Sequence, residues 1–322
     1  MKAVVVTHYG PPEEYTIADV PVPRPGPGQL QVRIAAASIN PADIRLPSGA
    51  FHDFAPLEFP HVPGNDFAGT VSEVGAGVIS YRVGDEIFGQ AVPRALRAMA
   101  GANRPSLSTG SLAEYAVFEA DTPFLAHRPP NLSVEQAAAL PTTGLTARAL
   151  MATANIQPGE TVLVIGATGG VGTAVLPLLA GVKAQVIATS TTADAPTIRA
   201  LGATRTIGYA EAEYPSDVDV ALNLTLPSDQ LTAVAAAVRP GGRLLTITYP
   251  VPEQGWIGRD DVELLFVLDM DGTYGGMREV GELAARGELP ATIGRRYTLD
   301  QGVQACVDFA RAHTTGKLLV TI

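Results

Sequence analysis

The chain has 322 residues, which is long for a single hydrophobic core and indicates two domains. Its formal net charge of −10 argues against nucleic acid or an anionic membrane as a partner, because both require a basic surface. The single cysteine, Cys306, excludes a disulfide framework and a cysteine-based structural zinc site. The opening stretch, MKAVVVTHYG, has no signal-peptide core, and no apolar run could span a bilayer, so we expect a cytoplasmic protein.

Residues 1–125 are expected to form a β-rich domain. Short alternating runs, such as residues 29–35 and 67–74, are separated by clusters of glycine and proline. Residues 90–110 contain three arginines, Arg94, Arg97 and Arg104, and no periodic pattern. A loop of this length is often functional, but a solvated surface excursion is an equal alternative.

From about residue 131 the pattern changes to alternating helices and strands. Ser133 and Gln136 form a capping-box pattern, which predicts a helix that begins at Ser133. Apolar runs then alternate with helical patterns, which indicates a parallel sheet covered on both faces. The predicted strands are residues 161–165, 185–189, 204–207, 218–222, 243–247 and 264–268. Two helices (277–286 and 301–311) and a strand (317–322) follow.

A glycine-rich stretch, 161-TVLVIGATGGVGTAV-175, joins the first of these strands to the next helix. This arrangement is typical of a dinucleotide-binding turn, where a pyrophosphate approaches the first turn of the helix. A side chain at Gly169 or Gly170 would block that approach, and Gly172 would let the helix pack closely on the strand. A tight turn without a ligand is the alternative. The expected cofactor contacts are Gly166, Ala167, Thr168, Gly169, Gly170, Val171 and Gly172.

The second strand ends in 187-IATSTT-192 and carries no acidic residue at its tip. An acidic residue there would bind the ribose 2′-hydroxyl of NAD. A carboxylate beside a 2′-phosphate would instead cost on the order of 4 kcal/mol at an effective dielectric constant of about 20. Because the hydroxyls of Thr189, Ser190 and Thr191 can donate to a phosphate, the sequence favours NADPH over NADH. No lysine or arginine lies at this tip.

A series of motifs resembles the zinc-independent medium-chain dehydrogenase/reductases of the quinone oxidoreductase, or zeta-crystallin-like, type. The motifs span essentially the whole chain: 38-SINPADIR-45, 63-PGNDFAGTVSEVGAGV-78, 84-GDEIFG-89, 110-GSLAEYAV-117, 137-AAALPTTGLTA-147, 158-PGETVLVIGATGGVG-172, 201-LGA-203, 240-PGGRLL-245 and 316-GKLLV-320. The resemblance implies an α/β fold. A GroES-like β-barrel catalytic domain (1–125 and 271–322) would be split by an inserted Rossmann domain with a doubly wound parallel sheet (126–270). It also implies an active site in the cleft between the domains and a homodimer paired through the last Rossmann strand, 262-VELLFVL-268.

Zinc-dependent relatives carry a cysteine ligand in the segment that matches Asn40, and a histidine and a glutamate at Asn65 and Asp66. Neutral amides are poor zinc ligands, so we predict no metal site. Without a metal, hydride transfer to a conjugated enone, enal or quinone is easier than reduction of an isolated ketone. The substrate is therefore expected to be a small-molecule electrophile of this kind.

The resemblance also implies roles for individual residues. Asn40 matches the family asparagine near the nicotinamide and could donate an N–H to the developing enolate. Asp43 could position that loop. The alternative for Asn40 is a turn residue before Pro41, and the alternative for Asp43 is an acidic residue at a helix N-terminus. The remaining positions implied to line the cofactor are Thr142, Thr146, Tyr209, Thr225, Thr248 and Tyr249, with ordinary packing or exposed loop positions as the alternative.

Two other functions remain open at this level. The first is an enoyl-thioester reductase of a biosynthetic pathway. Such reductases of the family use a tyrosine as proton donor in the segment where this chain has Phe51. A non-catalytic NADPH-binding protein is the second, because some zeta-crystallin-like relatives have structural or RNA-binding roles. The acidic net charge argues against RNA binding.

Overall fold

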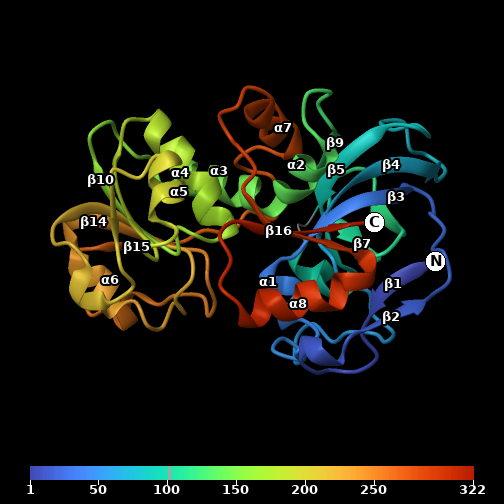
Figure 1. Ribbon diagram of the computed structural model, residues 1–322, viewed down its shortest axis with the longest axis horizontal. Coiled ribbons are helices and arrows are strands. Elements are labelled where there is room, and N and C mark those ends of the chain that lie inside the picture. The colour runs from blue at the N-terminus through green and yellow to red at the C-terminus, as the bar shows by residue number, and fades with distance from the viewer. Residues whose placement is uncertain (101–102) are drawn as a thin grey trace. The chain divides into compact units, whose positions relative to one another are not determined.

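The computed structural model describes residues 1–100 and 103–322, and its contacts divide the chain into two compact units (Figure 1). The first unit comprises Met1–Leu145, Met270–Arg286 and Ala291–Ile322, and the second comprises Thr146–Asp269 and Gly287–Pro290. Helix α2 (Val134–Ala139) belongs to the first unit, because it packs against that unit's sheet. Its predicted start is confirmed: the Oγ of Ser133 accepts from the N–H of Gln136 at 3.2 Å.

The first unit is built on a nine-stranded, mostly antiparallel sheet centred on β3. Its strands are β3 (Gln29–Ser38), β4 (Asp66–Val74), β5 (Glu86–Gln90), β6 (Val92–Pro93), β7 (Leu107–Ser108), β8 (Tyr115–Glu119), β9 (Leu125–His127), β16 (Ile293–Thr298) and β17 (Lys317–Thr321). A separate pair, β1 (Lys2–Val5) and β2 (Thr16–Asp19), lies at the N-terminus. The core between these strands includes the rings of Phe67 and Phe118, stacked with their centroids 4.0 Å apart.

Strand β17 brings the end of the chain beside β3. The two strands are antiparallel, with Leu319 opposite Ser38, and the N–H of Ile39 donates to the carbonyl of Leu318 at 3.0 Å. Helices of this unit are α1 (Pro41–Arg45), α7 (Met277–Ala285) and α8 (Gly302–Arg311), with short 3-10 helices η1 (Pro12–Glu14), η2 (Arg94–Met99) and η5 (Leu299–Gln301). The pairing of β17 with β3 places Lys317, the first residue of β17, next to the segment that follows β3.

The region 90–110 has more regular structure than its sequence indicated. It contains β6, η2 and β7, and Arg104 forms an ion pair with Asp121 at 2.7 Å. Residues 101 and 102 of this predicted loop lie outside the described residues.

The second unit has a six-stranded parallel sheet, as predicted. Its strands are β10 (Thr161–Ile165), β11 (Gln185–Thr189), β12 (Arg205–Ile207), β13 (Val218–Asn223), β14 (Val238–Thr246) and β15 (Glu263–Phe266). The spatial order is β12-β11-β10-β13-β14-β15, which is the doubly wound order of a Rossmann sheet. The accompanying helices are α4 (Gly170–Gly181), α5 (Ala195–Ala200), α6 (Thr232–Ala237), η3 (Glu211–Glu213) and η4 (Gln254–Ile257); α3 (Pro141–Ala154) begins in the first unit and continues into the second.

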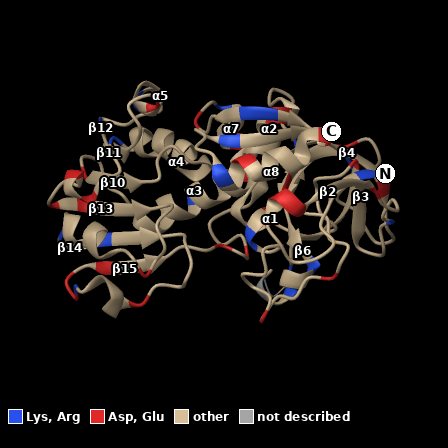
Figure 2. Cartoon of the chain, turned by 60° about the horizontal axis from the view of Figure 1, so that its bottom comes forward, with Lys and Arg blue, Asp and Glu red and all other residues tan. Residues whose placement is uncertain are grey.

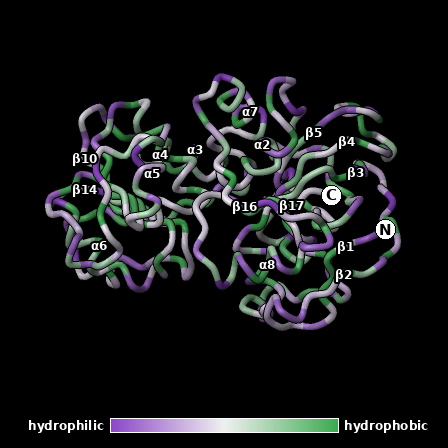
Figure 3. The backbone as a smooth tube through the Cα atoms, viewed as in Figure 1, coloured by the Kyte–Doolittle hydropathy of each residue, from purple (hydrophilic) through white to green (hydrophobic). Residues whose placement is uncertain are grey.

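The distribution of polarity follows this architecture. The central strands of both sheets are largely buried and apolar, and their hydropathy can be followed in Figure 3. Lysine and arginine are interspersed with aspartate and glutamate over the described chain, as Figure 2 shows. Within the described residues, no helix has the length and apolar character needed to cross a membrane.

Candidate functional site

The glycine-rich stretch forms the turn between β10 and α4. Gly166 has a φ of +85°, in the left-handed region that favours glycine. Gly169 is the N-cap of α4, and its N–H donates to the carbonyl of Gly166 at 3.1 Å. A Cβ added at Gly172 would lie 2.4 Å from the carbonyl oxygen of Ala167. The close packing predicted for Gly172 is therefore confirmed, although the contact is with the turn after β10 and not with the strand itself.

The same turn fits the diphosphate of a dinucleotide. Chain neighbours aside, a Cβ at Gly169 would meet one described protein atom within 4 Å, the carbonyl oxygen of Gly166 at an ordinary contact distance of 3.4 Å. The space beside this N-cap is thus open to a ligand. The N–H groups of Gly170, Val171 and Gly172 begin the helix, where the backbone donors have no intrahelical acceptor. The first turn of α4 contains no acidic residue that would repel an anion.

The strand tip after β11 differs from the sequence-based expectation. Thr189 is fully buried; its Oγ1 accepts from the N–H of Gly166 at 3.0 Å and donates to the carbonyl of Val164 at 3.3 Å. Its single hydroxyl proton is therefore donated to β10, while its oxygen holds the glycine turn, and the proton is not directed toward a phosphate. This corrects the donor role predicted for Thr189, since sequence spacing does not show where a hydroxyl points.

The neighbouring tip residues also have specific positions. Ser190 is buried, and its N–H donates to the carbonyl of Ile207 at 2.9 Å. The hydroxyl of Thr191 donates to the carboxylate of Asp194, whose N–H donates back to Thr191 Oγ1 at 3.1 Å. An acidic side chain therefore lies against the tip, closer than its place in the sequence suggested. This carboxylate opposes the binding of a 2′-phosphate there.

Tyr209 lies beside the glycine turn, although 41 positions separate it from Thr168. Its phenol oxygen is 3.2 Å from the Oγ1 of Thr168, and the residue is 45% exposed. A partly exposed tyrosine at the edge of the turn can contact a ligand that enters there. Ala167, the other turn residue predicted to line the cofactor, is fully buried, so only its backbone could contribute.

A second polar cluster, at the ends of β13 and β14, holds the loop after β13. The Nδ2 of Asn223 is 2.9 Å from Thr246 Oγ1 and 3.1 Å from Thr248 Oγ1. Ser228 Oγ lies 3.0 Å from Thr246 Oγ1, and Thr225 packs against the position of Gly166. Sequence reasoning selected Thr225 and Thr248 but missed Asn223, Thr246 and Ser228.

The ring of Tyr249 packs edge-on against Phe266, with centroids 5.4 Å apart.

The sequence signal for the missed residues Asn223, Thr246 and Ser228 was available at Asn223, because a buried amide at the end of an apolar strand needs hydrogen-bond partners.

In the first unit, Asn40 and Asp43 fix the chain segment that leaves β3. Asn40 is the N-cap of α1, with Pro41 at the first helical position. The Oδ2 of Asp43 accepts from the N–H of Asn40 at 2.8 Å, and its Oδ1 accepts from the N–H of Gly64 at 3.0 Å. Asp43 is therefore both a helix N-terminal acid and a link between two segments, so the two alternatives drawn from the sequence are compatible.

The stability of the protein is predicted to depend on the ionisation of Asp43. Burial raises the pKa of this carboxyl to about 7, although the N–H of Asn40 opposes the shift. Near pH 5 the folded state then holds a proton on Asp43 that the unfolded state has released, so the contribution of Asp43 to the free energy of unfolding should fall as pH rises toward 7. In Asp43→Asn this fall should be absent. Urea unfolding of parent and variant across this range measures the difference.

The exposed Asp53→Asn substitution is the matched control for this experiment, because it removes a carboxylate that is 92% exposed. Its unfolding should follow the parent at every pH. An equal pH dependence in the parent and in Asp43→Asn would contradict the assignment.

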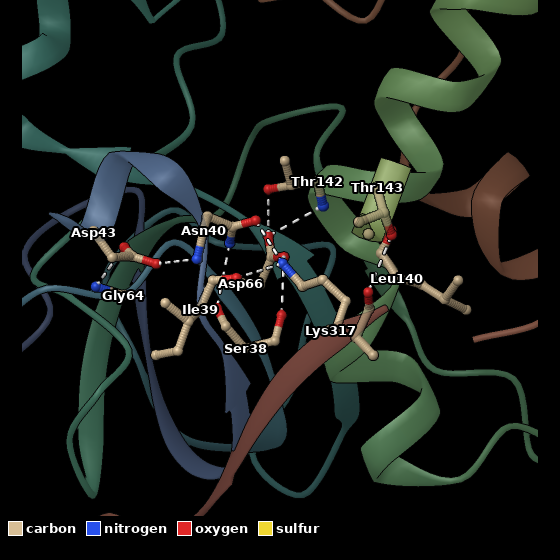
Figure 4. A network of polar contacts seen from close by, with 12 residues as sticks. Ser38, Ile39, Asn40, Asp43, Gly64, Asp66, Leu140, Thr142, Thr143 and Lys317 are labelled. Atoms are coloured by element: carbon tan, nitrogen blue, oxygen red, sulfur yellow. Dashed lines mark hydrogen bonds and ion pairs between the residues drawn. The ribbon is translucent and has the colours of Figure 1, made fainter. Parts of the chain in front are cut away.

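The side chain of Asn40 is held by a lysine that sequence reasoning missed (Figure 4). The Nζ of Lys317 donates to Asn40 Oδ1 at 2.6 Å, to the carbonyl of Ile39 at 2.8 Å and to Asp66 Oδ2 at 3.3 Å. Lys317 is 6% exposed and Asp66 is fully buried. The available signal was position 317 itself, a charged residue at the start of an otherwise apolar strand.

Asp66 joins this lysine to helix α3. It accepts from Ser38 Oγ at 3.1 Å, and its Oδ1 accepts from the hydroxyl of Thr142 at 2.6 Å and from the Thr142 N–H at 3.1 Å. Thr142 thus takes part in the same network as Asn40. Thr146 is half-buried one turn further along α3, on the same helix face.

Among the described residues, no group of three or more histidine, cysteine, aspartate or glutamate side chains could hold a metal ion.

Comparison with known proteins places these features in a family. Residues 26–129 match the model of the alcohol dehydrogenase GroES-like domain, and residues 201–320 match the model described as zinc-binding dehydrogenase. The chain is 31% identical to the NADPH-dependent alkenal/one oxidoreductase of Arabidopsis thaliana, over 99% of this chain and 79% of that protein. It is 33% identical to a quinone-oxidoreductase homolog of Spinacia oleracea, over 94% of this chain and 92% of that protein. The solved quinone oxidoreductase of Coxiella burnetii has a TM-score of 0.86 at 25% identity and covers 100% of this chain and 99% of its own.

A GroES-like domain together with a doubly wound parallel sheet defines a medium-chain dehydrogenase/reductase. The chain belongs to the quinone oxidoreductase family of these oxidoreductases. The resemblance drawn from the motifs and the expected α/β fold are thereby confirmed.

Proposed function

We propose that the protein is a zinc-free, NADPH-dependent reductase that transfers hydride to a quinone or an α,β-unsaturated carbonyl. The relatives named alkenal/one oxidoreductase and quinone oxidoreductase support this substrate class. The observation that carries the proposal is the buried Asn40 amide, held by Lys317 beside Asp66; the described residues contain no group of three or more histidine, cysteine, aspartate or glutamate side chains that could hold a metal ion. The open glycine turn at Gly169 is the proposed dinucleotide site.

When bound, NADPH supplies the hydride, and the residues of this chain orient and stabilise the reacting groups. Gly169, Gly170 and Val171 would hold the diphosphate at the start of α4. Asn40 Nδ2 donates one proton to the carbonyl of Ser38, at 3.3 Å. Its second proton has no acceptor among the described residues, so it is available to the substrate carbonyl oxygen on which negative charge develops.

The absence of zinc is part of this proposal, and it rests on charge as well as on ligand type. The ammonium of Lys317 contacts both Asn40 and Asp66, two of the positions where zinc-dependent relatives carry ligands. A divalent cation placed among these side chains would be repelled by the ammonium at short range. Amide oxygens do not compensate for this repulsion, because zinc prefers thiolate and imidazole ligands.

The preference for NADPH is proposed from two observations that outweigh a third. The Arabidopsis relative is named for NADPH, and Tyr209, a position that the family resemblance implies to line the cofactor, lies beside the glycine turn. The Asp194 carboxylate at the strand tip works in the opposite direction, so we expect the preference to be modest.

The proposed setting is a cytoplasmic homodimer without nucleic acid or membrane as a partner. The free, buried Cys306 is compatible with a reducing compartment. Strand β15 is the outermost strand of the parallel sheet and could pair with the same strand of a second copy.

A substrate panel is predicted to show turnover of a simple enone and a 1,4-benzoquinone with NADPH. The reaction should continue after dialysis against a chelator, with no stoichiometric zinc by metal analysis, because no step depends on a metal. NADH should support it less well.

Each rival function has its own outcome in the same panel. Turnover of an enoyl-CoA alone would favour an enoyl-thioester reductase. NADPH binding without turnover of any electrophile would favour a non-catalytic protein, and activity lost with removal of bound zinc would refute the metal-free proposal.

A further inference from the structure

We propose that Lys317 orients and polarises the side-chain amide of Asn40, and so acts as a positioning residue for hydride transfer. This inference rests on the proposed function, in which Asn40 donates a hydrogen bond to the substrate oxygen. Lys317 is 6% exposed and its ammonium donates to Ile39, Asn40 and Asp66, so it would act through Asn40.

The orientation argument follows from the chemistry of the two groups. An amide side chain can be placed with its oxygen and nitrogen exchanged, and its partners decide between the two arrangements. An ammonium group has three donors and no acceptor, so the atom of Asn40 that lies 2.6 Å from Lys317 Nζ must be the oxygen. The nitrogen then faces away from the lysine, with the Ser38 carbonyl 3.3 Å from it. Lys317 thereby fixes Asn40 as a donor rather than an acceptor toward the substrate.

The polarisation argument concerns the strength of that donor. A hydrogen bond from a charged donor to an amide oxygen draws electron density toward the oxygen, which makes the amide N–H groups more acidic donors. Both side chains are buried, so solvent screens this effect weakly. The charge of Lys317 would thus be felt at the substrate oxygen across one amide group.

The lysine is itself held in one position. Its three donors are matched by three acceptors, on Ile39, Asn40 and Asp66. Asp66 is in turn held by hydrogen bonds from Ser38 and Thr142. The register of β17 on β3 sets where Lys317 lies along β3. Because each N–H of the ammonium has an acceptor, moving Lys317 would break these hydrogen bonds. The amide of Asn40 is therefore oriented before a substrate binds.

A double-mutant cycle on kcat tests the inference. Lys317→Met should lower kcat roughly 10- to 100-fold, less than loss of the Asn40 donor itself, with the Kd for NADPH changed by less than about twofold. In an Asn40→Ala background the same substitution should change kcat by less than about twofold, because the amide through which it acts is gone. An equal loss in both backgrounds would overturn the inference. Lys317→Arg, which keeps a charged donor, should retain more activity than Lys317→Met.

A spectroscopic readout keeps the inference testable without turnover, and also if Lys317→Met does not fold. The side-chain NH₂ signals of Asn40 in ¹⁵N-labelled protein are identified by their loss in Asn40→Ala. They should shift in Lys317→Arg and further in Lys317→Met, while the exposed Asn131 signals stay in place. Unchanged Asn40 signals would overturn the inference. An inactive parent protein would refute the proposed function but leave this readout intact, so the two failures are distinguishable.

Discussion

Replacement of Gly169 by valine is expected to leave the fold intact and to weaken NADPH binding by roughly 100-fold or more, equivalent to about 2.7 kcal/mol. Gly169 has extended backbone angles, φ −71° and ψ 175°, which valine adopts without strain. Chain neighbours aside, a Cβ there meets no described protein atom closer than 3.4 Å, so the added side chain begins in the open space beside the first turn of α4. That space is where the diphosphate would approach the helix N–H groups. Titration of the variant with NADPH, followed by nucleotide fluorescence, measures the loss.

The matched control for this substitution is Gly172→Ala, three residues further along the same turn. Its Cβ would lie 2.4–2.5 Å from backbone atoms of Ala167, so this variant should lose stability rather than affinity alone. Thermal unfolding of both variants separates the two effects. Parent-like affinity in Gly169→Val would contradict the phosphate site, and a destabilised Gly169→Val would contradict the open space described beside the N-cap.

Replacement of Asn40 by alanine is expected to lower kcat by roughly 100- to 1000-fold, the loss typical of removing one oxyanion donor. The Kd for NADPH should change by less than about twofold, because the diphosphate site belongs to another part of the chain. The substitution also leaves the ammonium of Lys317 without one of its three acceptors, so a loss of stability on the order of 1–3 kcal/mol is expected.

Steady-state kinetics with an enone, together with urea unfolding, measures both effects. Asn131→Ala removes an exposed amide whose Nδ2 donates to the carbonyl of Ala285, and it serves as the control with unchanged kcat. A kcat for Asn40→Ala close to that of the parent would show that the amide does not stabilise the developing charge.

The parallel sheet was predictable because its strands are apolar runs with glycine and turn residues between them. The glycine turn was predictable because the backbone requirements at Gly166 and Gly172 arise from residues close by in the sequence. The structure confirms six parallel strands, with β14 starting at Val238, earlier than predicted, around a register shift opposite β13. Boundaries of this kind depend on pairing with a neighbouring strand, which the sequence does not display.

The polar network around Asn40 was only partly predictable. Asn40 was selected from its motif, but Lys317 lies 277 positions away and reaches it only because β17 pairs with β3 in one particular register. Asp66 was recognised as a changed zinc-site residue, whereas its bonds to Thr142 and Lys317 depend on long-range packing. Thr189 shows the opposite case: its position was predicted, but its hydroxyl is used by the backbone of the glycine turn.

The most direct test of the account follows the transferred hydrogen. The reduction of an enone with NADPH deuterated at C4 of the nicotinamide, on the face from which hydride is transferred, can be analysed by NMR of the product. The account predicts deuterium at the β-carbon of a saturated ketone, with the carbonyl retained. Deuterium at the carbonyl carbon of an alcohol would show that the protein reduces the ketone itself, and would contradict hydride addition to a conjugated acceptor.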